Sequence, residues 1–589
     1  CIVVDPKVAR KGFFDLCGAG VALKLVEALG GREEAKKYLD IVAIATIADV
    51  VPLKNDNRII AYYGLKQITK SPRKGVKMLL NQESVSAQDV MFRLAPRMNA
   101  AGRLNSAMKV VGLFLETDYF LLRTLTDELA RDNAQRQELC EKAVASAKAQ
   151  LAGINFNDVG IIVLKSNEWE AGILGIACAR LVEEFKRPTI LFARTDEGEL
   201  RGSARSIPQV NVFELLCSLS EYFTGFGGHA QAAGISMNED KFDDFVKAAN
   251  KSVLDMHEKL DLTHEISCEM ELPFDMDFLS FAKELELMEP TGYQNPRPTF
   301  LVKAQGLRFD RIGFSQHVKY VAKNIELMGF SKFAPCLAAK TGRVDFEISL
   351  GINAFQNRES AQGIIQTLQF EDVDIEDDEA IRMNLHQLDC EGSANLSQTT
   401  VEKTEEWLKE PFGTAIVCFS HEEYDNVCKA SEKVKSLPVL LATPRCLNPE
   451  NCVVLCPADC FDFSFFNRVI VAGHPLCDGY LAKLQRESSE IYALGDCSSK
   501  PISVSKDVLR KVYKEIVNVS RRTPKMASPH KMYVIVCSGY KTSESTFMLA
   551  LKIFDQLGTV RINDKGFVEI SAKSVNLENS IAYRNVSKA

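Results

Sequence analysis

Two glycines stand directly before a histidine in the stretch Phe226-Gly227-Gly228-His229-Ala230-Gln231-Ala232-Ala233-Gly234, and the chain has only 8 histidines in all. Because Gly227 and Gly228 carry no side chains, their backbone N–H groups can come close to a bulky anion. A histidine at that place can hydrogen-bond a phosphate or position a reacting group. A tight turn around a buried histidine would explain the same residues, so the stretch alone leaves two interpretations open.

The composition is that of an ordinary globular protein. The chain has 589 residues, 46% of them hydrophobic and 25% charged, and this length predicts roughly three to five domains. A net charge of −7 gives no general affinity for nucleic acid, although a local basic groove would suffice. No apolar run is long enough to span a bilayer. The 17 cysteines, with no secretory signal, predict free thiols in a reducing cytoplasm.

Apolar periodicity predicts an α/β chain with a long connecting helix. The first residues, Ile2–Val4, are predicted as a strand, and Leu39–Ala48 as a helix. Residues 117–151 contain neither proline nor glycine and predict one helix of about 50 Å, with Thr117 as its N-cap. Its three- and four-residue spacing runs through Leu122, Leu125, Leu129, Arg136, Leu139 and Ala143. Residues 159–237 then alternate strands and helices.

The second half of the chain predicts three further parts. Short segments with turn signals in residues 290–370 suit a small barrel of the OB type. The acidic run at 371–379 predicts a solvated linker. Strand–helix alternation resumes near residue 412, and Thr546–Ile570 predicts a helix followed by a β-ribbon, as in a winged-helix module.

Asp49 is the first candidate for chemistry, because it ends an apolar helical run. There it faces the negative end of the helix dipole, which is unfavourable unless a cation or a donor compensates. A locally hydrogen-bonded turn aspartate is one interpretation. A ligand for Mg²⁺ or Mn²⁺, which prefer carboxylates, is the other.

An arginine-rich segment follows, punctuated by Pro96 and Gly102, which predict a fixed, non-repeating path. It holds four candidates for phosphate binding: Arg93, Arg97, Asn99 and Arg103. Clustered guanidiniums and an amide suit bidentate recognition of phosphate. Surface ion pairing would explain the segment equally well.

A third candidate group lies in Arg201–Ser206. If this segment is a strand, Arg201, Ser203 and Arg205 share one face by the two-residue period. A hydroxyl and two guanidiniums on one face would make an anion cradle. The alternative is an amphipathic strand with its polar face in water.

Four segments, in their order and spacing, resemble the RecJ single-stranded-DNA exonucleases of the DHH phosphoesterase superfamily: Ala45–Leu53, Phe92–Leu104, Leu200–Ile207 and Gly225–Ser236. The resemblance is specific up to about residue 370; beyond, the chain is similar to the extra C-terminal domain of Firmicute-type RecJ proteins. It implies a multidomain α/β fold with these parts: the C-terminal part of a DHH phosphoesterase domain at 1–115, a connecting helix at 116–152, a DHH-associated nucleic-acid-binding domain at 153–256, an OB-fold β-barrel at 257–371, an acidic linker at 372–400, and a C-terminal α/β domain with a winged-helix-like end at 401–589.

The resemblance also implies an activity, the 5′→3′ hydrolysis of single-stranded DNA in repair and recombination. In that family two Mn²⁺ or Mg²⁺ ions activate the attacking water. By resemblance, Asp49 is a metal ligand and catalytic residue, and His229 is a second catalytic residue that faces the metals. Phosphate binding is carried over onto Arg97, Asn99, Arg103, Ser203, Arg205, Gly227 and Gly228. The implied partners are single-stranded DNA and a single-strand-binding protein or helicase, for a cytoplasmic monomer that does not contact membranes.

One departure from the family is large. The sequence has no Asp-His-His, and no Asp-x-Asp in a fitting context. We therefore expect an N-terminally truncated sequence whose metal site is incomplete and which hydrolyses little DNA by itself. Two alternatives remain open. One is a catalytically inactive single-stranded-DNA-binding protein, and the other is a DHH phosphoesterase that acts on short oligonucleotides.

Overall fold

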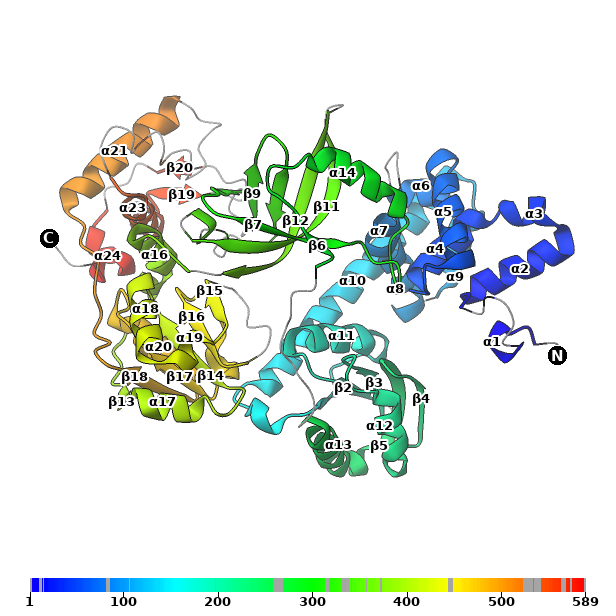
Figure 1. The fold of residues 1–589 in the computed structure, drawn as a ribbon, viewed down its shortest axis with the longest axis horizontal. Coiled ribbons are helices and arrows are strands. Elements are labelled where there is room, and N and C mark those ends of the chain that lie inside the picture. Colours follow the sequence, from blue (N-terminus) through cyan, green and yellow to red (C-terminus); the bar gives the residue numbers. More distant parts are fainter. Residues whose placement is uncertain are drawn as a thin grey trace.

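The computed structural model describes residues 3–586 apart from positions 10–12, 14, 81–84, 105, 196–197, 258–267, 313–316, 331–335, 337, 341, 356–357, 371–372, 443–448, 523–532, 534–535, 537–541, 563–567 and 572–574. The chain forms a helical N-terminal part, a five-stranded α/β domain, a seven-stranded sheet and a second α/β domain (Figure 1). One long helix, α10 (Tyr119–Leu151), runs between the first two parts.

The described residues of the N-terminal part form helices joined by loops. Its elements are α1 (Pro6–Ala9), α2 (Gly18–Gly30), α3 (Arg32–Lys36), α4 (Leu39–Ala48), α5 (Asn55–Lys70), α6 (Lys74–Leu80), α7 (Ala87–Asp89), the π-helical turn η1 (Val90–Leu94), α8 (Ala95–Leu104) and α9 (Met108–Leu115). The strand predicted at the start is wrong for Val3 and Val4, which are exposed and belong to neither a helix nor a strand, while Ile2 lies outside the described residues. A strand needs a partner for its backbone groups, and the described neighbours are helices.

The non-repeating path predicted for the arginine-rich segment is also wrong, because η1 and α8 form continuous helix there. Pro96 would remove one helical hydrogen bond and clash with the preceding turn. The Ala95 N–H reaches back five residues to the Val90 oxygen instead, and this wider π turn accommodates the proline ring.

The connecting helix α10 confirms the predicted long helix but not its cap. The Asp118 carboxylate accepts hydrogen bonds from the N–H groups of Phe120 (2.9 Å) and Leu121 (3.0 Å), so Asp118 is the N-cap and Thr117 lies one residue before it. Gly153 follows the helix with φ +76°, the left-handed conformation that glycine adopts easily.

The first α/β domain is built on a sheet of order β1-β2-β3-β5-β4. Its strands are β1 (Ile162–Ser166), β2 (Thr189–Arg194), β3 (Glu199–Arg205), β4 (Gly225–His229) and β5 (Ala232–Asn238). Helices α10 and α11 (Leu174–Phe185) pack on one face, and α12 (Val212–Ser218) and α13 (Phe242–His257) on the other. Leu200 and Ala204 of β3 are buried while the alternate residues are not, which confirms the strand predicted there.

The next domain is a seven-stranded sheet of order β6-β7-β11-β12-β10-β9-β8, with α14 (Phe278–Leu285) against it. The strands are β6 (Met270–Glu271), β7 (Thr299–Ala304), β8 (Asp310–Arg311), β9 (Val318–Val321), β10 (Glu326–Gly329), β11 (Val344–Phe355) and β12 (Arg358–Phe370). Strands β6 and β8 stand at the two ends of this order, and the described residues show no pairing between them.

The predicted acidic linker is largely structured. Residues 377–384 form α16 (Asp377–Asn384), and Val373, Ile375 and Ala380 are buried among the neighbouring core side chains. Apolar residues interrupt the acidic run at intervals that let one side pack, while Asp374, Glu376 and Asp377 stay exposed. The described part of this segment therefore belongs to the fold.

The second α/β domain has a parallel sheet of order β13-β18-β17-β14-β16-β15. It contains β13 (Ser397–Thr399), α17 (Val401–Trp407), β14 (Thr414–Cys418), α18 (His421–Ala430), α19 (Glu432–Lys435), β15 (Val439–Leu441), β16 (Cys452–Leu455), β17 (Arg468–Val471), α20 (Asp478–Glu487) and β18 (Glu490–Leu494). These bounds confirm the predicted alternation of strands and helices.

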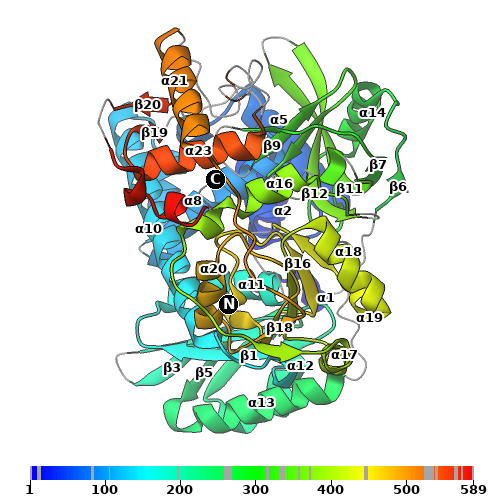
Figure 2. The same cartoon turned by 90° about the vertical axis from the view of Figure 1, so that its left-hand side faces the viewer.

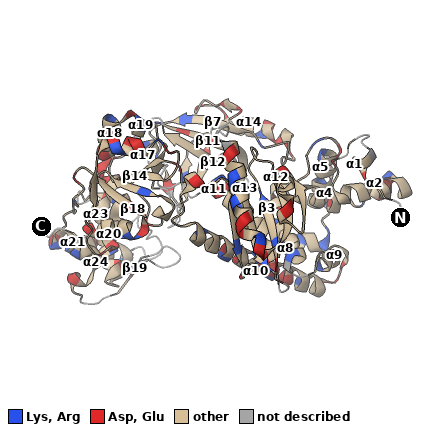
Figure 3. Ribbon diagram, turned by 90° about the horizontal axis from the view of Figure 1, so that it is seen from below, with Lys and Arg blue, Asp and Glu red and all other residues tan. Residues whose placement is uncertain are grey.

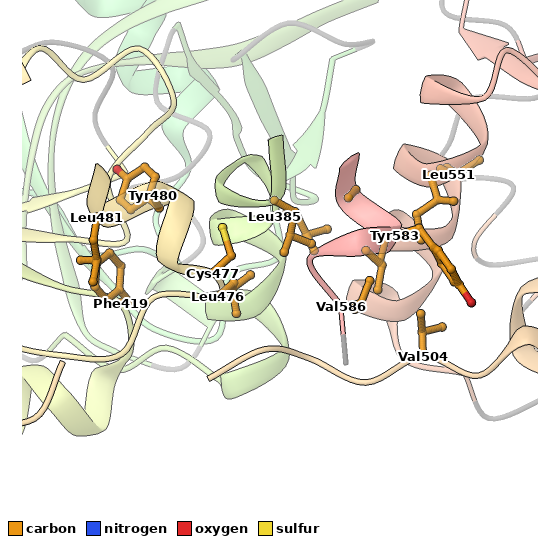
Figure 4. Close-up of a cluster of buried hydrophobic side chains, with 14 of the residues drawn as sticks. Leu385, Phe419, Leu476, Cys477, Tyr480, Leu481, Val504, Leu551, Tyr583 and Val586 are labelled. Atoms are coloured by element: carbon orange, nitrogen blue, oxygen red, sulfur yellow. The ribbon is translucent and has the colours of Figure 1, made fainter. Parts of the chain in front are cut away.

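The chain ends in α21 (Lys506–Arg522), α23 (Glu544–Gln556), the antiparallel ribbon β19 (Val560–Ile562) and β20 (Val568–Ile570), and α24 (Ile581–Arg584). A helix followed by a ribbon is what the sequence predicted. One buried cluster joins this end to the sheet, with Leu385, Leu476 and Cys477 near Tyr583 and Val586 (Figure 4). The helix-and-ribbon end is therefore a packed part of the C-terminal domain.

Candidate phosphate-binding site

Ser203 and Arg205 lie on the face of β3 that α11 covers. A Cβ added at Gly175, in the first turn of α11, would lie 2.7 Å from an Arg205 guanidinium nitrogen and 3.1 Å from the Ser203 hydroxyl. A larger residue at Gly175 would push the Arg205 guanidinium away, so this glycine lets the guanidinium lie against the first turn of α11. The N-cap Ile173 makes no side-chain cap, so no cap side chain competes for the first N–H groups of α11. A helix N-terminus beside a hydroxyl and a guanidinium is suited to an anion.

Arg205 has no carboxylate partner among the described residues. Its Nη1 donates to the Ala204 carbonyl (2.7 Å) and to the Ser203 hydroxyl (3.3 Å). Burial lowers the pKa of the guanidinium; Cys178 opposes that shift and the nearby charge of Arg103 adds to it. A partly buried cation beside another cation is costly unless an anion joins them.

Arg103 reaches this place from α8. Its Nη1 donates to the Gly172 carbonyl at 3.1 Å, and a Cβ at Gly172 would lie 2.7 Å from the Arg103 carbonyl oxygen. Gly172 belongs to the 3₁₀ turn η3 (Ala171–Ile173) that leads into α11. The end of α8 thus packs on the start of α11, where Arg205 of β3 also lies. The predicted segments 92–104 and 200–207 therefore meet at this place.

Arg136 of α10 is a further member that the sequence analysis did not select. Its Nε is buried without a hydrogen-bond partner among the described residues. Burial lowers its pKa; the Cys140 thiol opposes this, and the charges of Arg103 and Arg180 lower the pKa further. In the sequence Arg136 stands between Leu129 and Leu139 in the spacing of α10, but that spacing does not reveal the arginines that lie near it from other elements.

The other arginines of the segment are held elsewhere. Arg97 donates to the Leu79 carbonyl at 2.8 Å, and Arg93 pairs with Asp89 at 3.2 Å. Asn99 is exposed on α8. On β3, Arg201 is exposed and pairs with Glu199 at 3.8 Å, so the predicted cradle contains one β3 guanidinium instead of two.

Gly227, Gly228 and His229 lie in the edge strand β4, and the chain turns tightly at Ala230-Gln231 into β5. The predicted tight turn is therefore present, but the buried histidine is wrong, because His229 is exposed. A Cβ at Gly228 would lie 2.2 Å from the Ala232 oxygen, whereas one at Gly227 would meet nothing within 4 Å. Gly228 is therefore required by the pairing with β5, and Gly227 faces open space. His229 is exposed at the strand end, and its Nδ1 accepts the Gln231 N–H at 3.3 Å.

Asp49 lies exposed at the C-terminal end of α4. The loop after it is fixed by the Leu53 N–H, which donates to the Tyr293 carbonyl at 2.9 Å, and by the Asn57 amide, which donates to the Pro52 carbonyl at 3.0 Å. No described group hydrogen-bonds or pairs with the Asp49 carboxylate, so nothing in that part of the chain offsets its position on the helix dipole.

The donor set does not fit a two-metal centre. Within the described ranges, no group of three or more His, Cys, Asp or Glu side chains could hold a metal ion. Asp49 alone is one carboxylate, whereas hard divalent cations take several oxygen ligands. The thiols near Cys452 do not change this, because burial raises the pKa of Cys456 to about 12, and Cys446 lies outside the described residues.

A cavity of about 430 Å³ in the C-terminal domain is not a second phosphate site. It lies where β14 and β17 end, the edge at which parallel sheets bind ligands. There the Glu423 carboxylate accepts the N–H groups of Phe419 (2.8 Å) and His474 (2.7 Å). An internal carboxylate thus occupies the backbone donors that an anionic ligand would need.

These features define a protein that joins a DHH-associated domain to an OB-type domain. Residues 158–255 match the DHHA1 domain family and residues 268–367 match the RecJ OB domain family. Sequence relatives include the single-stranded-DNA-specific exonuclease RecJ of Bacillus subtilis, 33% identical over 60% of this chain and 46% of that protein. RecJ of Escherichia coli is 31% identical over 62% of this chain and 70% of that protein.

Solved structures give the same relationship. RecJ from Thermus thermophilus in complex with Mg²⁺ has a TM-score of 0.55 and 26% identity, over 77% of this chain and 70% of that one. The chain belongs to the RecJ family. It spans about half the length of the Bacillus subtilis relative. No described helix is both long and apolar enough to cross a membrane.

Proposed function

We propose that this chain binds single-stranded DNA for 5′→3′ exonucleolytic degradation in repair and recombination, and that Ser203, Arg205, Arg103 and Arg136 hold a backbone or 5′-terminal phosphate. The main support is that the guanidiniums of Arg103, Arg136 and Arg205 lie close to the first turn of α11, with no described carboxylate to neutralise them. RecJ relatives named as single-stranded-DNA-specific exonucleases support the substrate class.

In this proposal the chain's own residues bind and orient the strand. The Arg205 guanidinium and the Ser203 hydroxyl donate to phosphate oxygens, and the N–H groups of α11 add the positive end of the dipole. Arg103 and Arg136 neutralise the remaining charge. His229 is exposed at the end of the edge strand β4, and we propose that it contacts the DNA phosphate from there. The open space at Gly227 would admit the DNA backbone.

Divalent Mn²⁺ or Mg²⁺ would supply an activated water for phosphodiester hydrolysis. Mg²⁺ and Mn²⁺ complexes of RecJ from Thermus thermophilus support divalent metal use in the family. Asp49 is proposed as one ligand, and the described residues do not provide the others. This incomplete set of metal ligands favours a second candidate function, the binding of single-stranded DNA without hydrolysis.

We also propose a single-strand-binding protein or a helicase as partner, and a monomer that acts in the cytoplasm.

The test uses residues 1–589 with a 5′-phosphorylated single strand, the matching duplex, and Mn²⁺. We expect tight binding of the single strand, weak binding of the duplex, and little release of nucleotides. Equal affinity for both forms would contradict the proposed substrate, whereas rapid Mn²⁺-dependent release of nucleotides would contradict the incomplete metal site and favour hydrolysis by these residues alone.

A further inference from the structure

The helix α21, near the C-terminus, has two different faces. Its apolar residues Leu509, Val512, Ile516 and Val519 are buried in the cluster that joins the chain end to the C-terminal sheet. This burial fixes which side of the helix faces solvent. In Figure 2 the helix projects from the same end of the molecule as the ribbon of β19 and β20.

The solvent face of α21 is mostly basic, although it also carries the exposed Asp507 and the half-buried Glu515. Lys506, Lys511, Lys514 and Arg521 are exposed and have no carboxylate partner in the described part of the chain, while Arg510 pairs with Asp507 at 3.1 Å. Figure 3 places this helix at the end of the molecule opposite the N-terminus. Lys506, Lys511, Lys514 and Arg521 are called the basic row below. Since the whole chain carries a net charge of −7, this positive row differs in sign from the chain as a whole.

The arrangement of the charges suits a long polyanion. Lys506, Arg510 and Lys514 follow one another at four-residue intervals, which places them about 6 Å apart along one side of the helix. Protein interfaces carry apolar and aromatic anchors at their centre. The apolar residues of α21 are buried or half-buried toward the domain, so the basic row offers charge without such an anchor.

We propose that the basic row of α21 binds the phosphate backbone of single-stranded DNA, without sequence preference, as a surface separate from the Arg205 site. Lysine and arginine side chains that neutralise phosphates release counterions, so this binding weakens steeply with salt. The surface keeps a strand on the C-terminal domain while its end is held elsewhere. This surface on α21 is independent of the phosphate site, because the two share no residues.

The test measures the salt dependence of binding of the full chain to a long, fluorescently labelled oligothymidylate. The variant K506Q/K511Q/K514Q/R521Q removes four charges from the row. We expect the slope of log K against log salt to become shallower by about 2.8, from about 0.7 for each phosphate contact. The control K36Q/K37Q/K429Q/K435Q removes four exposed charges elsewhere and leaves the slope unchanged.

A charge-retaining variant, K506R/K511R/K514R, is expected to keep the parent slope, which separates loss of charge from loss of folding. The same loss of slope is expected when Arg205 is already replaced, so failure of the phosphate site and failure of this surface are distinguishable. An unchanged slope in the row variant, as expected if an acidic protein were the partner, overturns the proposal. An equal change in the row variant and in the control also overturns it.

Discussion

Replacement of Arg205 by glutamine removes one guanidinium from the phosphate site while leaving β3 in place. Arg205 donates within the chain only to the Ala204 carbonyl and the Ser203 hydroxyl, both of which glutamine can partly satisfy. A hydrogen bond to a charged group contributes about 1.5–3 kcal/mol, so we expect the Kd for a 5′-phosphorylated single strand to rise about 10- to 150-fold. The salt slope should become shallower by about 0.7.

The stability of R205Q should move in the opposite direction to its binding. Burial and the neighbouring Arg103 charge both disfavour the Arg205 cation in the free protein. Its removal relieves repulsion, so the free energy of unfolding in urea should not fall. Sites built for ligands are where stability and function trade against each other.

The matched control for this prediction is Arg201→Gln, four residues earlier on the same face of β3. Arg201 is exposed and already paired with Glu199, so its loss should leave both the Kd and the stability unchanged. Fluorescence anisotropy with a labelled strand measures both variants. An R205Q protein that binds like the parent, or an R201Q protein that loses as much affinity, would refute the reasoning.

Three further predictions concern stability, each measured by urea unfolding. Gly228→Ala should cost about 1–3 kcal/mol by overpacking, because its Cβ would lie 2.2 Å from a β5 carbonyl oxygen, whereas Gly227→Ala should be neutral; equal effects would contradict the edge-strand geometry. Arg187→Met should cost more than about 3 kcal/mol, because the arginine is 1% exposed and donates to three backbone carbonyls; a mild effect would contradict that network. Burial raises the pKa of Cys178 and Cys456 from 9.0 to about 12. The unfolded thiols lose their protons at lower pH than the folded ones, so the free energy of unfolding should hold below pH 9 and fall as the pH rises toward 12. An unfolding midpoint that stays constant over that range would count against buried neutral thiols.

Local patterns in the sequence predicted most elements, and the errors have physical causes. The strands and helices after residue 412 follow from apolar runs bounded by turn residues, and α10 from a run without breakers. Pro96 led to the wrong prediction of a break in the helix, because a π turn accommodates the proline ring inside the helix, and periodicity does not reveal such a turn. The acidic run misled because its few apolar residues pack with side chains from distant segments.

The candidate site likewise has features that the sequence predicts and features that only the structure reveals. The two-residue period placed Ser203 and Arg205 on one face of a strand, and the structure has them there. Arg136 could not be ranked from sequence, since its role depends on the meeting of α8, α10 and α11, which lie far apart in the chain. The structure also separates Gly228, which strand pairing requires, from Gly227, which it leaves free.

The most direct test of the account is a crystal structure of this chain with a short 5′-phosphorylated single strand. We expect a phosphate group within hydrogen-bonding distance of the Ser203 hydroxyl and the Arg205 guanidinium, at the first turn of α11. A strand bound in the crystal with no phosphate at that turn, and with Arg103 and Arg136 away from the nucleic acid, would contradict it.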